Sequence, residues 1–183
     1  RTAPAHPFAL GIVETIRSEV LGEDRCLNIG LPQGYHPDSA AHYPVVYLLD
    51  GGADEDFIHI GGLMQFAGFE WVGWQRPCIV VGIANTDRKR DFTFPTTNAA
   101  DKANYPTTGG SAAFIRYLTR EVIPFVEAHY HTFPERTLIG QSLGGLLATE
   151  VLLREPSFFN HYLIVSPRLW WGDEHVLSLS TDV

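Results

Sequence analysis

The chain has 183 residues, enough for one domain that buries roughly 70% of its unfolded surface. Its composition, 45% hydrophobic and 19% charged, is typical of a globular protein. The net charge of −8, from 13 basic and 21 acidic residues, argues against a nucleic-acid partner. No apolar run approaches the roughly 20 residues that cross a bilayer, so we expect no membrane partner either.

Two cysteines, Cys26 and Cys78, each lie in an apolar, strand-like run, where a buried reduced thiol is expected. No cluster of cysteine and histidine has the spacing of a zinc site, so we predict no metal and no cofactor. The first seven residues do not form a signal peptide, although they could remain after one is removed. The compartment, cytoplasm or periplasm, and the oligomeric state therefore stay open.

The first half of the chain predicts strands around one helix. Residues 8–20 and 24–31 are predicted as two strands around a turn at 21–24, and the second alternates apolar with small or polar residues. Residues 43–50 are apolar without alternation and stop at Gly51-Gly52, as in a central parallel strand covered on both faces. A helix over 54–70 and another buried strand over 78–83 follow.

The second half begins with a polar stretch, residues 85–110, which we expect to be a functional loop without regular structure. Residues 111–130 form an amphipathic pattern that predicts a helix with a kink or break at Pro124. A short apolar run at 137–139 predicts a strand, the leucines from Leu143 onward predict a helix, and residues 162–166 predict one more strand.

Strands that alternate with helices predict a mostly parallel sheet with helices on both faces, in a single domain over residues 1–183. In such sheets ligands bind beyond the carboxyl ends of the strands. Four segments lie at those ends and should converge: Asp50–Gly52, Asn85–Thr86, Ser142 and Ser166–Pro167.

The pattern G-x-S-x-G occurs at residues 140–144, between the predicted strand and the predicted helix. An abrupt turn from strand to helix exposes the central Ser142 and points the free amides of the new helix at the space above it. Glycine is required on both sides because a Cβ would collide where strand and helix pass. We therefore predict that Ser142 is a nucleophile; the alternative is a glycine-rich turn without chemistry.

At these residues the chain resembles the α/β-hydrolase superfamily, and within it the Putative esterase family of esterase D and the ferri-siderophore esterases. The resemblance is carried by Y-L-L-D-G-G at 47–52, G-I-A-N-T-D-R-K-R-D-F-T at 82–93, G-Q-S-L-G-G at 140–145 and S-P-R-L-W-W at 166–171. It implies a three-layer sandwich and a serine esterase acting through an acyl-enzyme on Ser142. The oxyanion would be held by the amides of Leu143 and of Gly51, with Gly52 as the alternative to Gly51.

The resemblance also requires an acid and then a histidine after the nucleophile. Only His161 and His175 follow Ser142. His161 opens a strand at the end of the sheet away from the site, and His175 is expected on a surface helix beside Asp173, a predicted helix-start residue. We therefore expect an incomplete α/β-hydrolase domain in which the C-terminal strands, the catalytic histidine and its acid are missing.

Arg88, Lys89 and Arg90 are candidates for binding an anionic or phenolate-bearing acyl group. The alternative is that Arg88 or Arg90 pairs with Asp87, Asp91 or Asp101. Trp170 and Trp171 are candidates for the floor of a pocket for an aromatic or sugar substrate, with packing under the sheet edge as the alternative for at least one of them. The predicted substrate is a small-molecule ester, either siderophore-like or an aryl ester. The alternative functions are an acyltransferase of the same fold and a non-catalytic, hydrolase-like binding domain.

Overall fold

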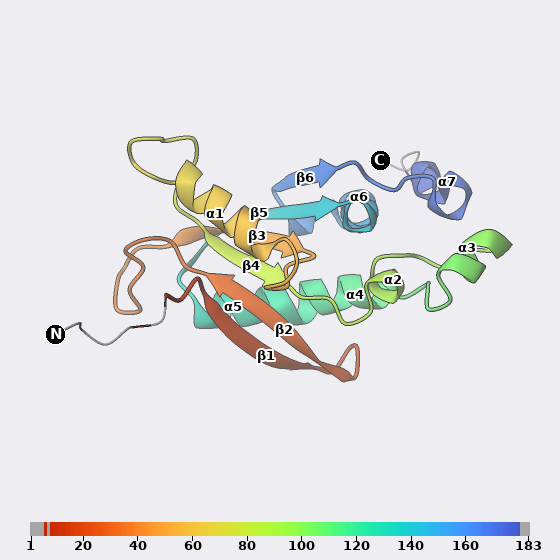
Figure 1. The fold of residues 1–183 in the computed structure, drawn as a ribbon, viewed down its shortest axis with the longest axis horizontal. Helices are drawn as coiled ribbons and strands as arrows, with labels where there is room; N and C mark the ends of the chain where they lie inside the picture. The colour runs from red at the N-terminus through yellow and green to blue at the C-terminus, as the bar shows by residue number, and fades with distance from the viewer. Residues whose placement is uncertain (1–5, 7, 180–183) are drawn as a thin grey trace.

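The computed structural model describes residue 6 and residues 8–179, so most of the segment before the first strand lies outside the described residues. Its centre is a six-stranded sheet in the order β1-β2-β4-β3-β5-β6 (Figure 1). The first two strands, β1 (Ile12–Ser18) and β2 (Glu23–Gly30), pair antiparallel, and β2 pairs antiparallel with β4. The other four strands run parallel: β3 (Tyr43–Leu49), β4 (Ile79–Ile83), β5 (Thr132–Gln141) and β6 (His161–Val165).

The order of the strands explains their sequence patterns. Strand β3 lies between β4 and β5, and both of its faces are covered: Tyr47 is 0% exposed and its neighbour Leu48 is 2% exposed. A strand buried on both faces has no polar side, which is why residues 43–50 do not alternate. The hairpin β1–β2 turns at Gly22, whose φ of +70° favours glycine. Strand β1 begins at Ile12, later than the predicted start at residue 8.

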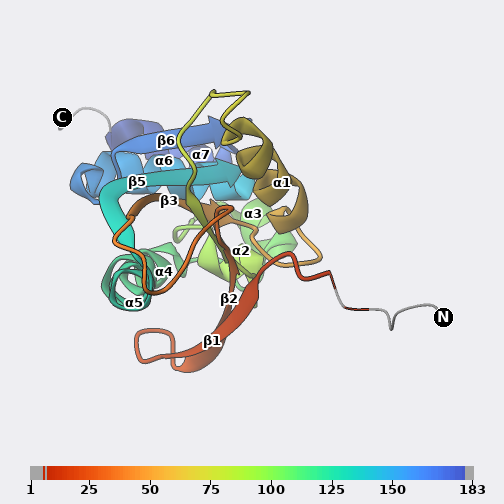
Figure 2. The same cartoon turned by 90° about the vertical axis from the view of Figure 1, so that its left-hand side faces the viewer.

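Seven α-helices lie in the described residues. They are α1 (Phe57–Ala67), α2 (Arg88–Asp91), α3 (Ala99–Asn104), α4 (Ser111–Tyr117), α5 (Ile123–His129), α6 (Leu143–Arg154) and α7 (Trp171–Ser178). Figure 2 shows α1 on one side of the sheet and α4 and α5 on the other. This arrangement confirms the predicted α/β class with a central sheet between two helical layers.

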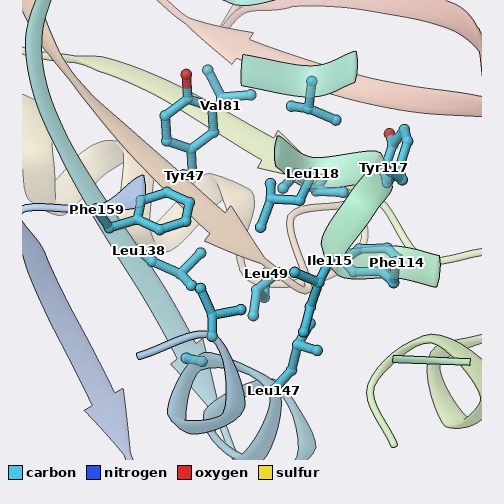
Figure 3. Packing of buried hydrophobic residues seen from close by; sticks show 14 of the residues in the cluster. Tyr47, Leu49, Val81, Phe114, Ile115, Tyr117, Leu118, Leu138, Leu147 and Phe159 are labelled. Atoms are coloured by element: carbon cyan, nitrogen blue, oxygen red, sulfur yellow. The ribbon is translucent and has the colours of Figure 1, made fainter. Parts of the chain in front are cut away.

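Each face of the sheet has its own apolar core. On one face Phe57 of α1 packs with Val46, Leu48, Val80 and Ile139. The larger core on the other face is shown in Figure 3, where side chains of β3, β4 and β5 meet those of α4 and α6. At roughly 2 kcal/mol for each large side chain removed from water, this second core is the main source of stability.

Two predictions about irregular segments need correction. The stretch 85–110 is not free of regular structure, because α2 and α3 lie inside it. Both helices are short and begin at a capping side chain: Asp87 accepts the amide of Arg90, and Asn98 accepts the amides of Ala100 and Asp101. Helices of this length show no apolar periodicity, so only the caps mark them in the sequence.

The predicted interruption at Pro124 is a π-helical turn, Leu118–Val122, between α4 and α5. Both residues that flank this turn, Tyr117 and Ile123, keep right-handed helical backbone angles, so the helical segment is not broken there. Proline lacks an amide hydrogen, and the wider turn before it accommodates the lost hydrogen bond.

No helix within residues 8–179 has the length and apolarity needed to traverse a bilayer.

Candidate active site

Ser142 lies at the turn between β5 and α6, with φ +56° and ψ −113°. A non-glycine residue rarely adopts such angles, and holding it there costs about 1–3 kcal/mol. Three backbone hydrogen bonds fix the turn: the Ser142 amide donates to Val165, and its carbonyl accepts the amides of Leu146 and Arg168, each at 3.0 Å. The residue is half-buried, and no side chain in the described residues hydrogen-bonds its hydroxyl. The hydroxyl is therefore free to react.

The glycines around Ser142 are needed for close approach. A Cβ on Gly140 would lie 2.3 Å from the carbonyl oxygen of Gly144. A Cβ on Gly145 would lie 3.0 Å from the Cα of Pro167, which follows β6. Real side chains essentially never tolerate the first of these distances, so the turn specifies glycine two residues before the serine.

The two predicted oxyanion donors differ in the acceptors of their amides. Leu143 is the first residue of α6, where an amide has no acceptor within its own helix. The Gly51 amide instead donates to the Ile83 carbonyl at 3.0 Å, which argues against its predicted role. The next amide, that of Gly52, donates to Glu55 Oε2 at 2.7 Å, so its acceptor is a side chain and not the sheet.

A polar network that the sequence did not reveal joins the strand ends. The Asp50 carboxylate, 7% exposed, accepts Arg88 Nε at 2.5 Å and Nη2 at 2.9 Å, and Asn85 Nδ2 at 2.6 Å. Asn85 Nδ2 also donates to Glu55 Oε1 at 2.6 Å, and Arg88 Nη2 to the Gln141 carbonyl at 3.3 Å. Burial alone would lower the pKa of Arg88, but its hydrogen bonds to Asp50 raise it. The predicted convergence of these strand ends is confirmed.

Neither predicted arginine is a free cation. Arg88 pairs with Asp50, a partner that we did not predict, and is about one third exposed. Arg90 pairs with Asp91 at 2.7 Å, one of the predicted alternatives, and with Glu23 at 2.6 Å. Both side chains therefore hold the segment around α2 against its neighbours.

The two tryptophans after β6 have different environments. Trp170 is 52% exposed, and the guanidinium carbon of Arg168 lies 4.5 Å from its ring centroid. Trp171 is fully buried and donates its indole N–H to the Phe94 carbonyl at 3.1 Å. The alternative of packing thus applies to Trp171, whereas Trp170 is accessible beside the turn.

No histidine in the described residues is hydrogen-bonded to Ser142. His161 opens β6 at the end of the sheet away from Ser142 and lies 3.4 Å from Glu135. His175 is exposed on α7, with its ring against Phe94. Asp173 lies in the first turn of α7, as predicted, but it does not cap the helix; its carboxylate accepts Asn98 Nδ2 at 2.9 Å. Nor do the described residues bring together three side chains that could hold a metal ion.

Comparison with known proteins places this geometry in a family. The family model described as Putative esterase matches residues 18–180. The ferri-bacillibactin esterase BesA of Bacillus subtilis is 32% identical over 85% of this chain and 58% of its own. An IroE-like serine hydrolase of Shewanella oneidensis has a TM-score of 0.84 and 34% identity, over 94% of this chain and 55% of its own.

A third relative is the enterobactin hydrolase IroE, solved in complex with DFP, with a TM-score of 0.69 and 26% identity over 94% of this chain and 69% of its own. The chain spans somewhat more than half the length of BesA and of the Shewanella hydrolase. The family model covers most of the chain, and the Shewanella hydrolase shares its fold over 94% of the chain. The chain therefore belongs to the Putative esterase family and has the α/β-hydrolase fold.

Proposed function

We propose that the protein is a serine hydrolase that cleaves a carboxylic ester through an acyl-enzyme on Ser142. The observation that carries the proposal is the strained backbone of Ser142, which holds an unengaged hydroxyl at the start of α6. Strain of this kind persists only where the surrounding structure over-determines it, and here three hydrogen bonds and the glycines do so. Membership of the family supports the same chemistry.

The Ser142 oxygen attacks the ester carbonyl, and the negative charge that develops on the carbonyl oxygen needs amide donors. The Leu143 amide at the start of α6 supplies one, aided by the positive end of the helix. We assign the second to Gly52 instead of Gly51, because the Gly51 amide is used inside the sheet. The Gly52 amide already donates to the Glu55 carboxylate. The substrate oxygen therefore either displaces this carboxylate or shares the amide with it.

The proton of Ser142 requires a general base, which in this fold is a histidine oriented by an acid. The Asp50–Arg88 ion pair contacts the residue before Ser142, because Arg88 also donates to the Gln141 carbonyl. We assign it a positioning role: it keeps the Gly52 loop and the Ser142 turn at a fixed distance. Neither side chain is proposed to transfer the proton.

The names of the relatives indicate the substrate class. BesA is named a ferri-bacillibactin esterase, and a relative from Aspergillus fumigatus is named a siderophore triacetylfusarinine C esterase. We propose a small-molecule ester of the siderophore kind as the substrate. Trp170, half-exposed beside the turn, is proposed to contact it, whereas Arg88 and Arg90 act through their ion pairs.

Labelling by a fluorophosphonate probe tests the proposal, with stoichiometry read by intact mass. We expect one adduct per chain in the natural full-length protein, mapped by peptide mass spectrometry to Ser142. The Ser142→Ala variant should lose the adduct, and Ser157→Ala, at an exposed serine in the turn after α6, should keep it. Absence of labelling in a folded wild-type protein would exclude the hydrolase.

Transfer of the acyl group to an alcohol shares this first half-reaction. The two activities differ in the second acceptor, so product analysis with a competing alcohol separates them. We expect the free acid as the main product, because the described site around Ser142 is open to solvent.

A further inference from the structure

Asn28 is a buried polar residue inside the sheet. It lies in β2 and is 4% exposed, between the apolar residues Leu27 and Ile29, both 0% exposed. Its partner in the neighbouring strand β4 is Gly82. Asn28 Nδ2 donates to the Gly51 carbonyl at 2.8 Å. A buried amide group destabilises the fold unless it is hydrogen-bonded, so the contact with the loop after β3 compensates for the burial of Asn28.

Two glycines bring the loop after β3 within reach of Asn28. A Cβ on Gly82 would lie 2.4 Å from the Gly51 carbonyl oxygen, and a Cβ on Gly51 would lie 2.2 Å from the Gly82 Cα. Real side chains essentially never tolerate such distances, so the Gly51 backbone lies directly against β4. Because β2 is the strand next to β4, the Gly51 carbonyl reaches the Asn28 side chain.

The hydrogen bond from Asn28 also fixes the direction of the Gly52 amide. The Gly51 carbonyl and the Gly52 amide belong to one planar, trans peptide unit, so the two groups point in opposite directions. Asn28 holds the carbonyl, and the amide donates to Glu55 Oε2 at 2.7 Å. Glycine flanks this peptide unit on both sides, so no Cβ limits its rotation. Contacts with other residues must therefore supply the constraint.

The loop that Asn28 holds adjoins the nucleophile. A Cβ on Gly144, two residues after Ser142, would lie 3.2 Å from Oδ2 of Asp50, the residue before Gly51. Arg88 joins the same Asp50 carboxylate to the carbonyl of the residue before Ser142. Rotation of the Gly51–Gly52 peptide unit would therefore turn an amide donor away from the reacting ester.

We infer that Asn28 is a positioning residue for the oxyanion: by holding the Gly51 carbonyl, it directs the Gly52 amide at the carbonyl oxygen of the ester. The inference rests on the proposed function of Ser142 and Gly52. Asn28 acts through the peptide unit and not on the ester itself. Amide donors stabilise the developing charge because they are oriented before the reaction begins. Loss of the Asn28 side chain should therefore slow acylation of Ser142 and leave binding of the reagent unchanged.

Fluorophosphonate labelling of the natural full-length protein, measured over a range of probe concentrations, tests the inference. Asn28→Ala should lower the labelling rate at saturating probe by about tenfold, because complete removal of one oxyanion donor costs about 100-fold or more and this donor is only misdirected. The probe concentration that gives half of the maximal rate should stay within about twofold of the wild type, since the donor acts in the transition state.

Thr119→Ala is the matched control. Thr119 is 8% exposed in the π-helical turn, and its hydroxyl donates to the Ile115 carbonyl at 2.8 Å. The variant also loses a buried hydrogen bond between a side chain and the backbone, so its urea midpoint should fall. Its labelling should match the wild type, because the π-helical turn lies outside the loop after β3 and the Ser142 turn.

Asn28→Asp adds a readout that loss of stability would not change. The aspartate has the same size but donates a hydrogen bond only when its carboxyl is protonated, and burial raises the pKa of a carboxyl. The labelling rate of the wild type divided by that of Asn28→Asp should therefore decrease as the pH falls from about 8 to about 5. The quotient cancels the titration of the general base, which both proteins share.

The possible failures are distinguishable. Labelling of folded Asn28→Ala at the wild-type rate, or a quotient for Asn28→Asp that is constant with pH, would overturn the positioning role and leave the hydrolase intact. Absence of labelling in the folded wild type would overturn the hydrolase and the positioning role together.

Discussion

Replacement of Gly140 by alanine should break the turn that holds Ser142. The added Cβ would lie 2.3 Å from the Gly144 carbonyl oxygen and 2.6 Å from its carbonyl carbon, both backbone atoms that cannot rotate away. A normal contact between carbon and oxygen is about 3.3 Å, so β5 and α6 must separate by about 1 Å. Overpacking of this size costs about 1–3 kcal/mol in unfolding free energy.

The same displacement should reduce reactivity more than stability. Moving a catalytic group by about 1 Å can cost a factor of about 100 in rate. We expect Gly140→Ala to lower the free energy of unfolding in urea by about 2 kcal/mol and the rate of fluorophosphonate labelling by about 100-fold. The two assays use the same protein sample, so a loss of labelling from unfolding alone is recognised.

Gly62 provides the matched control. It lies inside α1, and a Cβ there would have no heavy atom within 4 Å. Because alanine favours a helix over glycine by about 1 kcal/mol, Gly62→Ala should stabilise the protein slightly and leave labelling unchanged. An ordinary surface substitution changes the free energy of unfolding by about 0.5 kcal/mol or less. If the free energy of unfolding of Gly140→Ala differs from that of the wild type by no more than this, and the variant is labelled at the same rate, the close-approach explanation of the turn is wrong.

Two further predictions concern the ion pairs behind the site. Asp91→Asn removes the buried carboxylate that lies 2.7 Å from the Arg25 guanidinium, and only the partly exposed Glu23 carboxylate, at 2.9 Å, remains beside it. The loss should be about 3–5 kcal/mol in urea unfolding, against less than about 1 kcal/mol for Asp24→Asn at the exposed pair with Arg17. An Asp91→Asn variant as stable as Asp24→Asn would contradict this. The Arg90 guanidinium holds the pKa of Glu23 below its ordinary value, so the Glu23 carboxylate adds stability that is complete above about pH 4.3 and is lost as the pH falls through the folded pKa. Glu23→Gln should therefore lower the urea midpoint at pH 7 and match the wild type at the acidic end; a constant difference at all pH values would refute the linkage.

The sequence was sufficient for the Ser142 turn because its determinants are local. An apolar strand, glycines at fixed offsets and a helical leucine pattern lie within about a dozen residues, and each constrains the backbone directly. The parallel sheet was predictable for a similar reason. Residues 43–50 do not alternate between apolar and polar, which a strand can do only where both of its faces are covered. The sequence therefore predicts that the strand ends at Asp50, Asn85 and Ser142 meet.

Only the tertiary structure decided which groups at those ends contact one another. Arg88 was expected to find an acid nearby in the sequence, but its partner is Asp50, 38 residues away, because β3 and β4 are neighbours in the sheet. The choice between the Gly51 and Gly52 amides likewise depends on the Ile83 carbonyl across the sheet. Arg168 and Tyr105 meet only because the segments after β6 and α3 both lie beyond the carboxyl ends of the parallel strands. Side-chain pairing between distant segments follows strand order and register, and no local pattern in the sequence encodes those.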